Sequence, residues 1–170
     1  SDVCSSDLHA STYDVLLGGL LAEDALMETA EHFDLLPSNT DLTAAEIELM
    51  DEEGREQRLK RALEPLKPRY DFILIDCPPA LGLLTLNALV ASDAVMVPRQ
   101  CEFYALEGLS HLIRTIERVK RAFNPGLDIH GVVLTMFDKR NNLSEQVAED
   151  VREHFPEQTL ETTIPRSVRI

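Results

Sequence analysis

The sequence predicts an α/β fold in which a mostly parallel sheet is flanked by helices. From Tyr70 onward, short apolar runs alternate with longer segments of helical periodicity, which is the pattern of repeated βαβ units. The run Phe72–Ile75 is apolar at every position, as is typical of a strand buried on both faces of a parallel sheet. Together these two observations favour parallel strands joined by right-handed helical crossovers.

The part of the chain before Tyr70 predicts short elements. Gly18 and Pro37 act as stop signals for a helical turn and a short strand. Thr43 is the expected N-cap of a helix, and Glu46 stands three residues later, as in a capping box. The expected elements are a helical turn over 14–21, a strand over 33–37, and helices over 43–50 and 55–66.

After Tyr70 the alternation becomes regular. The expected strands cover 72–76, 94–97, 132–136 and 160–164, and the expected helices cover 82–91, 105–123 and 142–155. Pro98 is expected to close the second of these strands. The helix over 105–123 repeats leucine, isoleucine and valine at helical spacing, so it presents one apolar face. Asn142 is the expected N-cap of the last helix, with Glu145 as its capping-box partner.

Composition and charge narrow the function classes. The chain has 170 residues, the size of one domain, and a net charge of −14, which argues against nucleic-acid binding by bulk charge. Any such binding would need a local basic patch. No apolar run approaches the roughly 18 residues that span a bilayer, so no membrane contact is expected. The three cysteines have no metal-ligand or disulfide spacing, which suits a reducing cytosol.

The first eight residues, SDVCSSDL, look foreign to the rest of the chain. They resemble the translation of a sequencing-library adapter, so we exclude residues 1–8 from the fold prediction. On this interpretation the natural protein begins upstream of His9, and residues 9–170 form part of a larger domain.

Asp76 follows the apolar run and precedes two prolines, Pro78 and Pro79. A carboxylate at the C-terminal end of a parallel strand lies where open α/β sheets bind ligands, and the prolines make the next segment a stiff turn. One interpretation is an Mg²⁺-binding carboxylate that acts through the metal's water shell. The alternative is a carboxylate that caps the turn. These residues alone favour neither.

Three segments carry a resemblance to a known family: YDFILIDCPPALGLLTLNALVASDAVMVPRQCEFYALEGL, GVVLTMFDKRNNLSEQV and TTIPRSVRI. They resemble the ParA/Soj family of chromosome- and plasmid-partitioning ATPases. The resemblance extends over nearly everything from Thr12 to Ile170. It implies a deviant P-loop NTPase that binds ATP and Mg²⁺, forms a homodimer with ATP, binds DNA nonspecifically and is stimulated by a ParB-like partner.

Two family segments are missing from this sequence. The family's phosphate-binding loop, of KGGVGKT type, has no counterpart here, and neither has the helical segment that follows the final strand in relatives. We therefore expect a partial P-loop NTPase-like domain that does not hydrolyse ATP on its own, because the backbone N–H groups and lysines that hold the phosphates are absent.

The resemblance assigns roles to individual residues. Asp76 matches the catalytic carboxylate on the Mg²⁺ side, and Pro78 and Pro79 match the turn that senses the γ-phosphate. Three further residues match positions that wall the adenine: Thr135, Met136 and Pro165. Two arginines match DNA-contacting positions: Arg140 and Arg169. Arginine suits this role because its planar fork donates two parallel hydrogen bonds to a phosphate.

The expected protein is cytoplasmic and nucleoid-associated. One alternative is a MinD-like positioning ATPase that associates with membrane, which the segments FDKR and IPRSVRI favour less. The other is a non-enzymatic interaction module without a phosphate loop. The sequence upstream of His9 would distinguish these possibilities, and the present sequence does not distinguish a chromosome from a plasmid as cargo.

Overall fold

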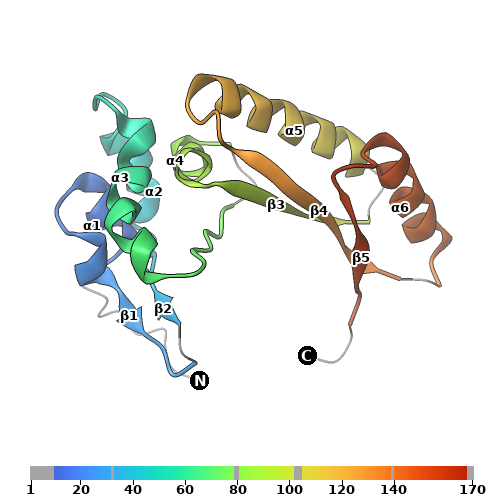
Figure 1. Ribbon diagram of the computed structural model, residues 1–170, viewed down its shortest axis with the longest axis horizontal. Coiled ribbons are helices and arrows are strands. Elements are labelled where there is room, and N and C mark those ends of the chain that lie inside the picture. The colour runs from blue at the N-terminus through green and yellow to red at the C-terminus, as the bar shows by residue number, and fades with distance from the viewer. Residues whose placement is uncertain (1–9, 32, 79–80, 102–104, 139, 168–170) are drawn as a thin grey trace. The chain divides into compact units, whose positions relative to one another are not determined.

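The computed structural model describes residues 10–31, 33–78, 81–101, 105–138 and 140–167. The adapter-like segment 1–8 therefore lies outside the described residues. The chain divides into two compact units, and the division falls between Ala91 and Ser92 (Figure 1).

The first unit is mainly helical. Its two short strands pair antiparallel, with Met27 opposite Leu35. In chain order the elements are α1 (Thr12–Leu17), η1 (Ala22–Ala25), β1 (Met27–Glu28), β2 (Asp34–Leu35), α2 (Leu42–Glu48), η2 (Arg55–Gln57), α3 (Arg58–Leu63), η3 (Glu64–Arg69) and α4 (Leu83–Ala91). The core of the unit is formed mainly by leucines and alanines from helices α1, η1, α2, α3, η3 and α4, and it includes the fully buried Ala45.

Helix α1 has defined ends. At its start, both the backbone N–H and the hydroxyl of Ser11 donate to the Asp14 carboxylate at 2.9 Å. At its end, Gly18 adopts a left-handed φ of 81°, the usual conformation of a helix-terminating glycine, as the sequence predicts.

Helix α2 begins one residue earlier than predicted, and the prediction that Thr43 caps it is wrong. The N-cap is Asp41, whose N–H donates to the Asn39 side chain at 3.1 Å. Glu46 does not complete a capping box, because its carboxylate accepts the backbone N–H of Leu84 at 3.2 Å, at the start of α4. A tertiary contact has replaced the local one.

The predicted strand over 72–76 is absent. Residues 72–78 form no strand, and no described strand pairs with them. Phe72 and Leu74 are 84% and 92% exposed, whereas Ile75 packs against the core of the first unit. An apolar run is buried on both faces only within a sheet whose two faces are covered, usually by helices, and in the described part of the chain this run joins no sheet.

The second unit is a βαβαβ unit, as predicted. Its elements are β3 (Ala94–Gln100), α5 (Ala105–Ala122), β4 (Asp128–Phe137), α6 (Asn142–His154) and β5 (Thr159–Pro165). The strands are parallel in the order β3-β4-β5, and α5 and α6 pack against each other along one face of the sheet (Figure 1). Pro98 lies within β3 and does not close it. β3 is an edge strand of the described sheet, a place that tolerates proline.

The cap of α6 also differs by one residue from the prediction. The N-cap is Asn141, whose side-chain oxygen accepts the N–H of Leu143 at 3.0 Å, and Asn142 is the first helical residue. The buried face of α6 includes Val147 and Val151, and that of α5 includes Leu109 and Ile116.

A buried asparagine joins three elements of the first unit. Asn87, on α4, is 1% exposed. Its side-chain oxygen accepts the N–H of Leu59 at 3.1 Å, and its nitrogen donates to the carbonyls of Arg55 at 2.8 Å and Leu83 at 3.0 Å. Leu59 is in the first turn of α3, where N–H groups have no acceptor within the helix. Asn87 therefore caps a helix that lies 28 residues away in sequence.

We expect Asn87→Ala to lower the free energy of unfolding by about 2–4 kcal/mol, because it leaves a buried N–H and a buried carbonyl without partners. Urea denaturation followed by circular dichroism measures this change. The control is Glu53→Ala, at an exposed turn residue, which should cost no more than about 0.5 kcal/mol. Equal losses in both variants would contradict the capping role of Asn87.

Candidate functional site

The C-terminal ends of the three parallel strands of the second unit lie at one edge of the sheet. Gln100 is the register partner of Thr135, and the N–H of Cys101 donates to the Thr135 carbonyl at 3.3 Å. On the other side of β4, Phe137 is the register partner of Pro165. This edge is the ligand-binding side of an open parallel sheet. It brings together three of the predicted residues: Thr135, Met136 and Pro165.

Met136 has a strained backbone. Its φ is 53°, in the left-handed region, which a non-glycine residue adopts at a cost on the order of 1–3 kcal/mol. Its side chain is 44% exposed, while Thr135 next to it is half-buried. Strain at a strand end next to an exposed apolar side chain is typical of a binding position.

Asp138 organises the turn after β4. Its carboxylate accepts the backbone N–H of Arg140 at 3.0 Å and the Nε of the same residue at 3.3 Å. These two hydrogen bonds, the backbone one first, lower the pKa of Asp138, and the charge of Arg166 adds to the effect. Arg166 is held close by, because its N–H donates to the Phe137 carbonyl at 2.9 Å.

The turn leaves a basic side chain in solvent. The side chain of Arg140 is 90% exposed although its Nε is bonded to Asp138. Arg140 and Arg166 therefore lie at the same sheet edge as Pro165. The other predicted DNA-contacting residue, Arg169, lies outside the described residues.

The sequence-based prediction missed Asp138. The available signal was local: a carboxylate two residues before an arginine and three before an asparagine is the pattern of an Asx turn leading into a capped helix.

The first unit contains the predicted metal-binding carboxylate. Asp76 and Pro78 are exposed, and within the described residues Asp76 has no hydrogen bond or ion pair. The nearby Cys77 has a raised pKa, first because its sulfur is desolvated and second because the Asp76 charge opposes a thiolate. A single unpaired carboxylate fits Mg²⁺, which keeps several waters and takes one or two protein carboxylates. Pro79 lies outside the described residues.

Sequence comparisons identify the family. A family profile described as an AAA domain matches residues 1–129. The Caulobacter vibrioides chromosome partitioning protein ParA is 53% identical over 165 residues, covering 95% of this chain and 62% of the relative. The Bacillus subtilis sporulation initiation inhibitor protein Soj is 49% identical over 166 residues, covering 97% of this chain and 66% of the relative. The chain belongs to the ParA/Soj family.

A solved structure agrees with this ParA/Soj fold. Cobyrinic acid a,c-diamide synthase from Mycobacterium smegmatis, crystallised with an ATP analogue and magnesium, superposes with a TM-score of 0.89 at 43% identity. The match covers 95% of this chain and 66% of the synthase. The chain thus spans just under two thirds of the length of these relatives. None of the helices in the described ranges is long and apolar enough to cross a membrane.

In this ParA/Soj chain we expect the carboxyl pKa of Asp138 to lie below the ordinary value and to rise in Arg140→Ala without returning fully, because the backbone N–H remains. A lowered carboxyl pKa stabilises the fold above the unfolded-state pKa. That stabilisation disappears as pH falls through the folded-state value.

Carbon-13 NMR titration of the Asp138 carboxyl group measures the pKa. Arg121→Ala is the control, since Arg121 bonds to the Glu117 carbonyl within α5 and should leave the Asp138 titration unchanged. An Asp138 that titrates identically in wild type and Arg140→Ala would contradict the contribution of the arginine side chain.

Proposed function

We propose that this chain is part of an ATP-dependent partition protein that binds ATP and Mg²⁺, dimerises with ATP and binds DNA nonspecifically. The observation that carries the proposal is the 53% identity to a chromosome partitioning ParA over almost the whole chain. The structure of the synthase relative with an ATP analogue and magnesium supports the choice of cofactors.

The proposed chemistry is phosphoryl transfer to water, in which protein groups position the reactants and neutralise charge. When bound, Mg²⁺ supplies charge neutralisation at the transferred phosphate. Asp76 is proposed to orient the metal's water shell, and Pro78 with Pro79 to hold the turn that detects the γ-phosphate. The carboxylate of Asp76 is exposed and has no ion pair within the described residues, which supports that role.

Two sets of residues are proposed to bind the ligands. The first set, Thr135, Met136 and Pro165, is proposed to form an apolar wall for adenine, which suits the exposed Met136 side chain at a strained backbone position. The second set, Arg140 and Arg169, is proposed to contact DNA phosphates. Because the chain has a net charge of −14, affinity for DNA has to come from a few basic side chains.

The proposed setting follows from the relatives. A ParB-like protein is the proposed stimulating partner, and the proposed location is the cytoplasm, in association with the nucleoid. The chromosome-partitioning function printed for the Caulobacter relative supports this setting through its identity to the chain.

We expect Asp76→Ala to lower ATP hydrolysis on the order of 100-fold or more, because the carboxylate that orients the metal's water shell is lost. The measurement uses a hybrid in which residues 10–170 replace the matching part of the Caulobacter ParA, since the chain spans 62% of that protein. Phosphate release at saturating MgATP is the readout.

Asp71→Ala is the matched control, because Asp71 is an exposed carboxylate five residues earlier. It should leave turnover unchanged. Normal turnover in Asp76→Ala, in a hybrid that is folded and active, would leave Asp76 as a turn residue and remove it from the catalytic site.

We expect Arg140→Ala and Arg169→Ala, in the same hybrid, to weaken DNA binding while sparing ATP-dependent dimerisation. Each lost phosphate contact should reduce the slope of log K against log salt by about one unit, so one arginine per protomer removes about two units per dimer. DNA affinity is measured across a salt series at saturating ATP, with dimer formation followed by light scattering.

Arg118→Ala is the control for these two variants, because Arg118 is an exposed arginine on α5. It should keep the wild-type salt slope. If Arg140→Ala and Arg169→Ala also keep that slope, the two arginines are ordinary surface residues and the proposed DNA contact is wrong.

A second candidate function is ATP-dependent amide synthesis, which is favoured by the name of the synthase relative with a TM-score of 0.89. The two functions share ATP and differ in DNA binding. A hybrid that forms amides and shows no ATP-dependent affinity for DNA would replace the partition proposal.

A further inference from the structure

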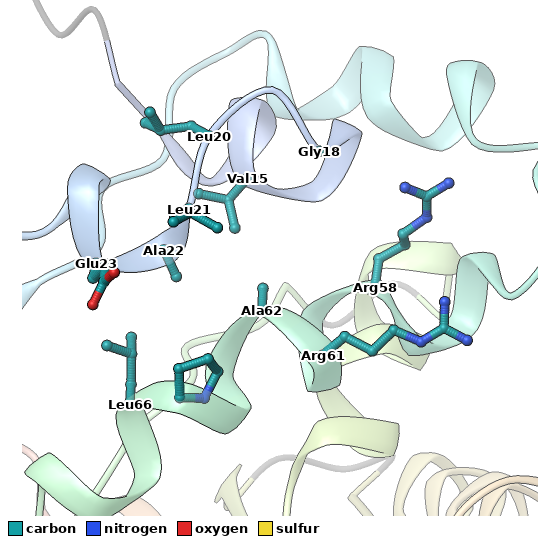
Figure 2. Close-up of a pocket in the computed structure, with 11 residues that line it drawn as sticks. Val15, Gly18, Leu20, Leu21, Ala22, Glu23, Arg58, Arg61, Ala62 and Leu66 are labelled. Atoms are coloured by element: carbon teal, nitrogen blue, oxygen red, sulfur yellow. The ribbon is translucent and has the colours of Figure 1, made fainter.

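The first unit contains a pocket of about 310 Å³ between the α1–η1 segment and the α3–η3 segment. Its apolar lining comes from Val15, Leu20, Leu21, Ala22, Ala62 and Leu66. Figure 2 shows these aliphatic groups gathered on one side of the opening, and the guanidinium groups of Arg58 and Arg61 on the other. Pro65 and Glu23 also line the pocket, and the Glu23 carboxylate pairs with Arg69 at 3.7 Å. One end of the pocket is therefore mostly apolar, and the other carries the two guanidinium groups.

Only some of the hydrogen-bond donors of Arg58 have an acceptor in the described structure. Its Nη2 donates to the Glu52 carboxylate at 2.9 Å, and its Nη1 lies beside Gly18. Its Nε is buried and, within the described residues, has no hydrogen-bond partner. The buried Nε is out of reach of a ligand in the pocket, so an anion there would accept from the terminal guanidinium N–H groups that Glu52 does not use.

Arg61 lies one turn after Arg58 on the same side of α3. Its guanidinium packs over Gly54, where a side-chain carbon would come within 3.0 Å of Nη2. Gly54 also has a left-handed φ of 68°, which favours glycine, so the backbone leaves room for this arginine. In the part of the chain that the structure describes, no carboxylate pairs with Arg61.

The charge of the surrounding segment singles out these two arginines. Residues 55–69 contain six of the sixteen basic residues of a chain whose net charge is −14. Four of the six lie within 3.7 Å of a carboxylate: Arg55 with Glu56, Arg58 with Glu52, Lys67 with Glu64, and Arg69 with Glu23. Of the six, only Arg58 and Arg61 line the pocket.

We propose that this pocket binds a small organic anion with a short aliphatic body, such as a medium-chain carboxylate. Two guanidinium groups one helical turn apart suit an anionic head, because each arginine can donate paired hydrogen bonds. The aliphatic lining suits an apolar body, and the volume is near the lower end of the roughly 300–1,000 Å³ of small-molecule sites. The proposal is independent of the nucleotide and DNA functions.

The test is titration of the full 170-residue chain with octanoate, followed by methyl NMR. We expect saturable shifts of the Val15, Leu20, Leu21 and Leu66 methyl signals. The double variant Arg58→Gln/Arg61→Gln should bind octanoate at least roughly tenfold more weakly than wild type does. Wild type should likewise bind 1-octanol at least roughly tenfold more weakly than octanoate. In each case the charge-assisted hydrogen bonds between the arginines and the carboxylate are lost.

Matched variants distinguish binding in the pocket from a general effect of positive charge or apolar surface on octanoate binding. The double variant Arg55→Gln/Lys60→Gln removes the same charge from residues outside the pocket and should bind octanoate as wild type does. Leu21 is 65% exposed, so Leu21→Ser shortens the apolar lining without a cost in folding and should lower the affinity for octanoate. Met50→Ser changes an exposed methionine elsewhere in the unit and should leave that affinity unchanged.

Three results would overturn the proposal. The first is equal binding of octanoate and 1-octanol. The second is equal weakening by the two charge-removing double variants. The third is that inorganic phosphate shifts the same methyl signals at the same concentrations as octanoate, because recognition would then not involve the aliphatic lining.

Discussion

Strand β4 has to satisfy its backbone hydrogen bonds along both edges, because parallel strands flank it on each side. Its central residues Val132 and Leu134 are fully buried, and a slip of one residue would move this apolar pair to the opposite face of the sheet. The fixed register places the end of β4 beside the ends of β3 and β5. The positions of Met136, Asp138 and the arginines at this edge all follow from that register.

The sequence predicted this part of the fold well, because its patterns are local. The apolar run of β4 and the helical spacing of α5 are visible in single segments, and Thr135 and Met136 lie near the end of a strand, as expected. The run Phe72–Ile75 has an equally clear pattern and forms no strand. Strand pairing is a tertiary property, so a pattern of residues can predict suitability for a sheet but cannot supply the neighbouring strands.

The helix N-caps were predicted wrongly because backbone geometry and tertiary contacts, and not the local sequence, decide which side chain caps a helix. Asn141 and Asn142 are identical in type, and only the backbone geometry decides which one caps α6. Glu46 stands at the right spacing for a capping box, yet it binds the start of α4. α3 receives its cap from Asn87, a residue that no local rule connects to it. Side chains that satisfy helix ends from distant elements tie those elements together, but they leave no periodic signal in the sequence.

Arg140 and Arg58 are each held by a single carboxylate, from Asp138 and Glu52 respectively. Arginine has five N–H donors, and one carboxylate occupies only part of them. Asp138 takes the Nε of Arg140 and leaves the rest of a 90% exposed side chain in solvent, whereas Glu52 takes an Nη of Arg58 and leaves the buried Nε unbonded. In each case the carboxylate restricts the arginine's position without using all of its donors. An acidic chain can in this way present oriented cationic groups to anions, even though its net charge opposes anion binding at long range.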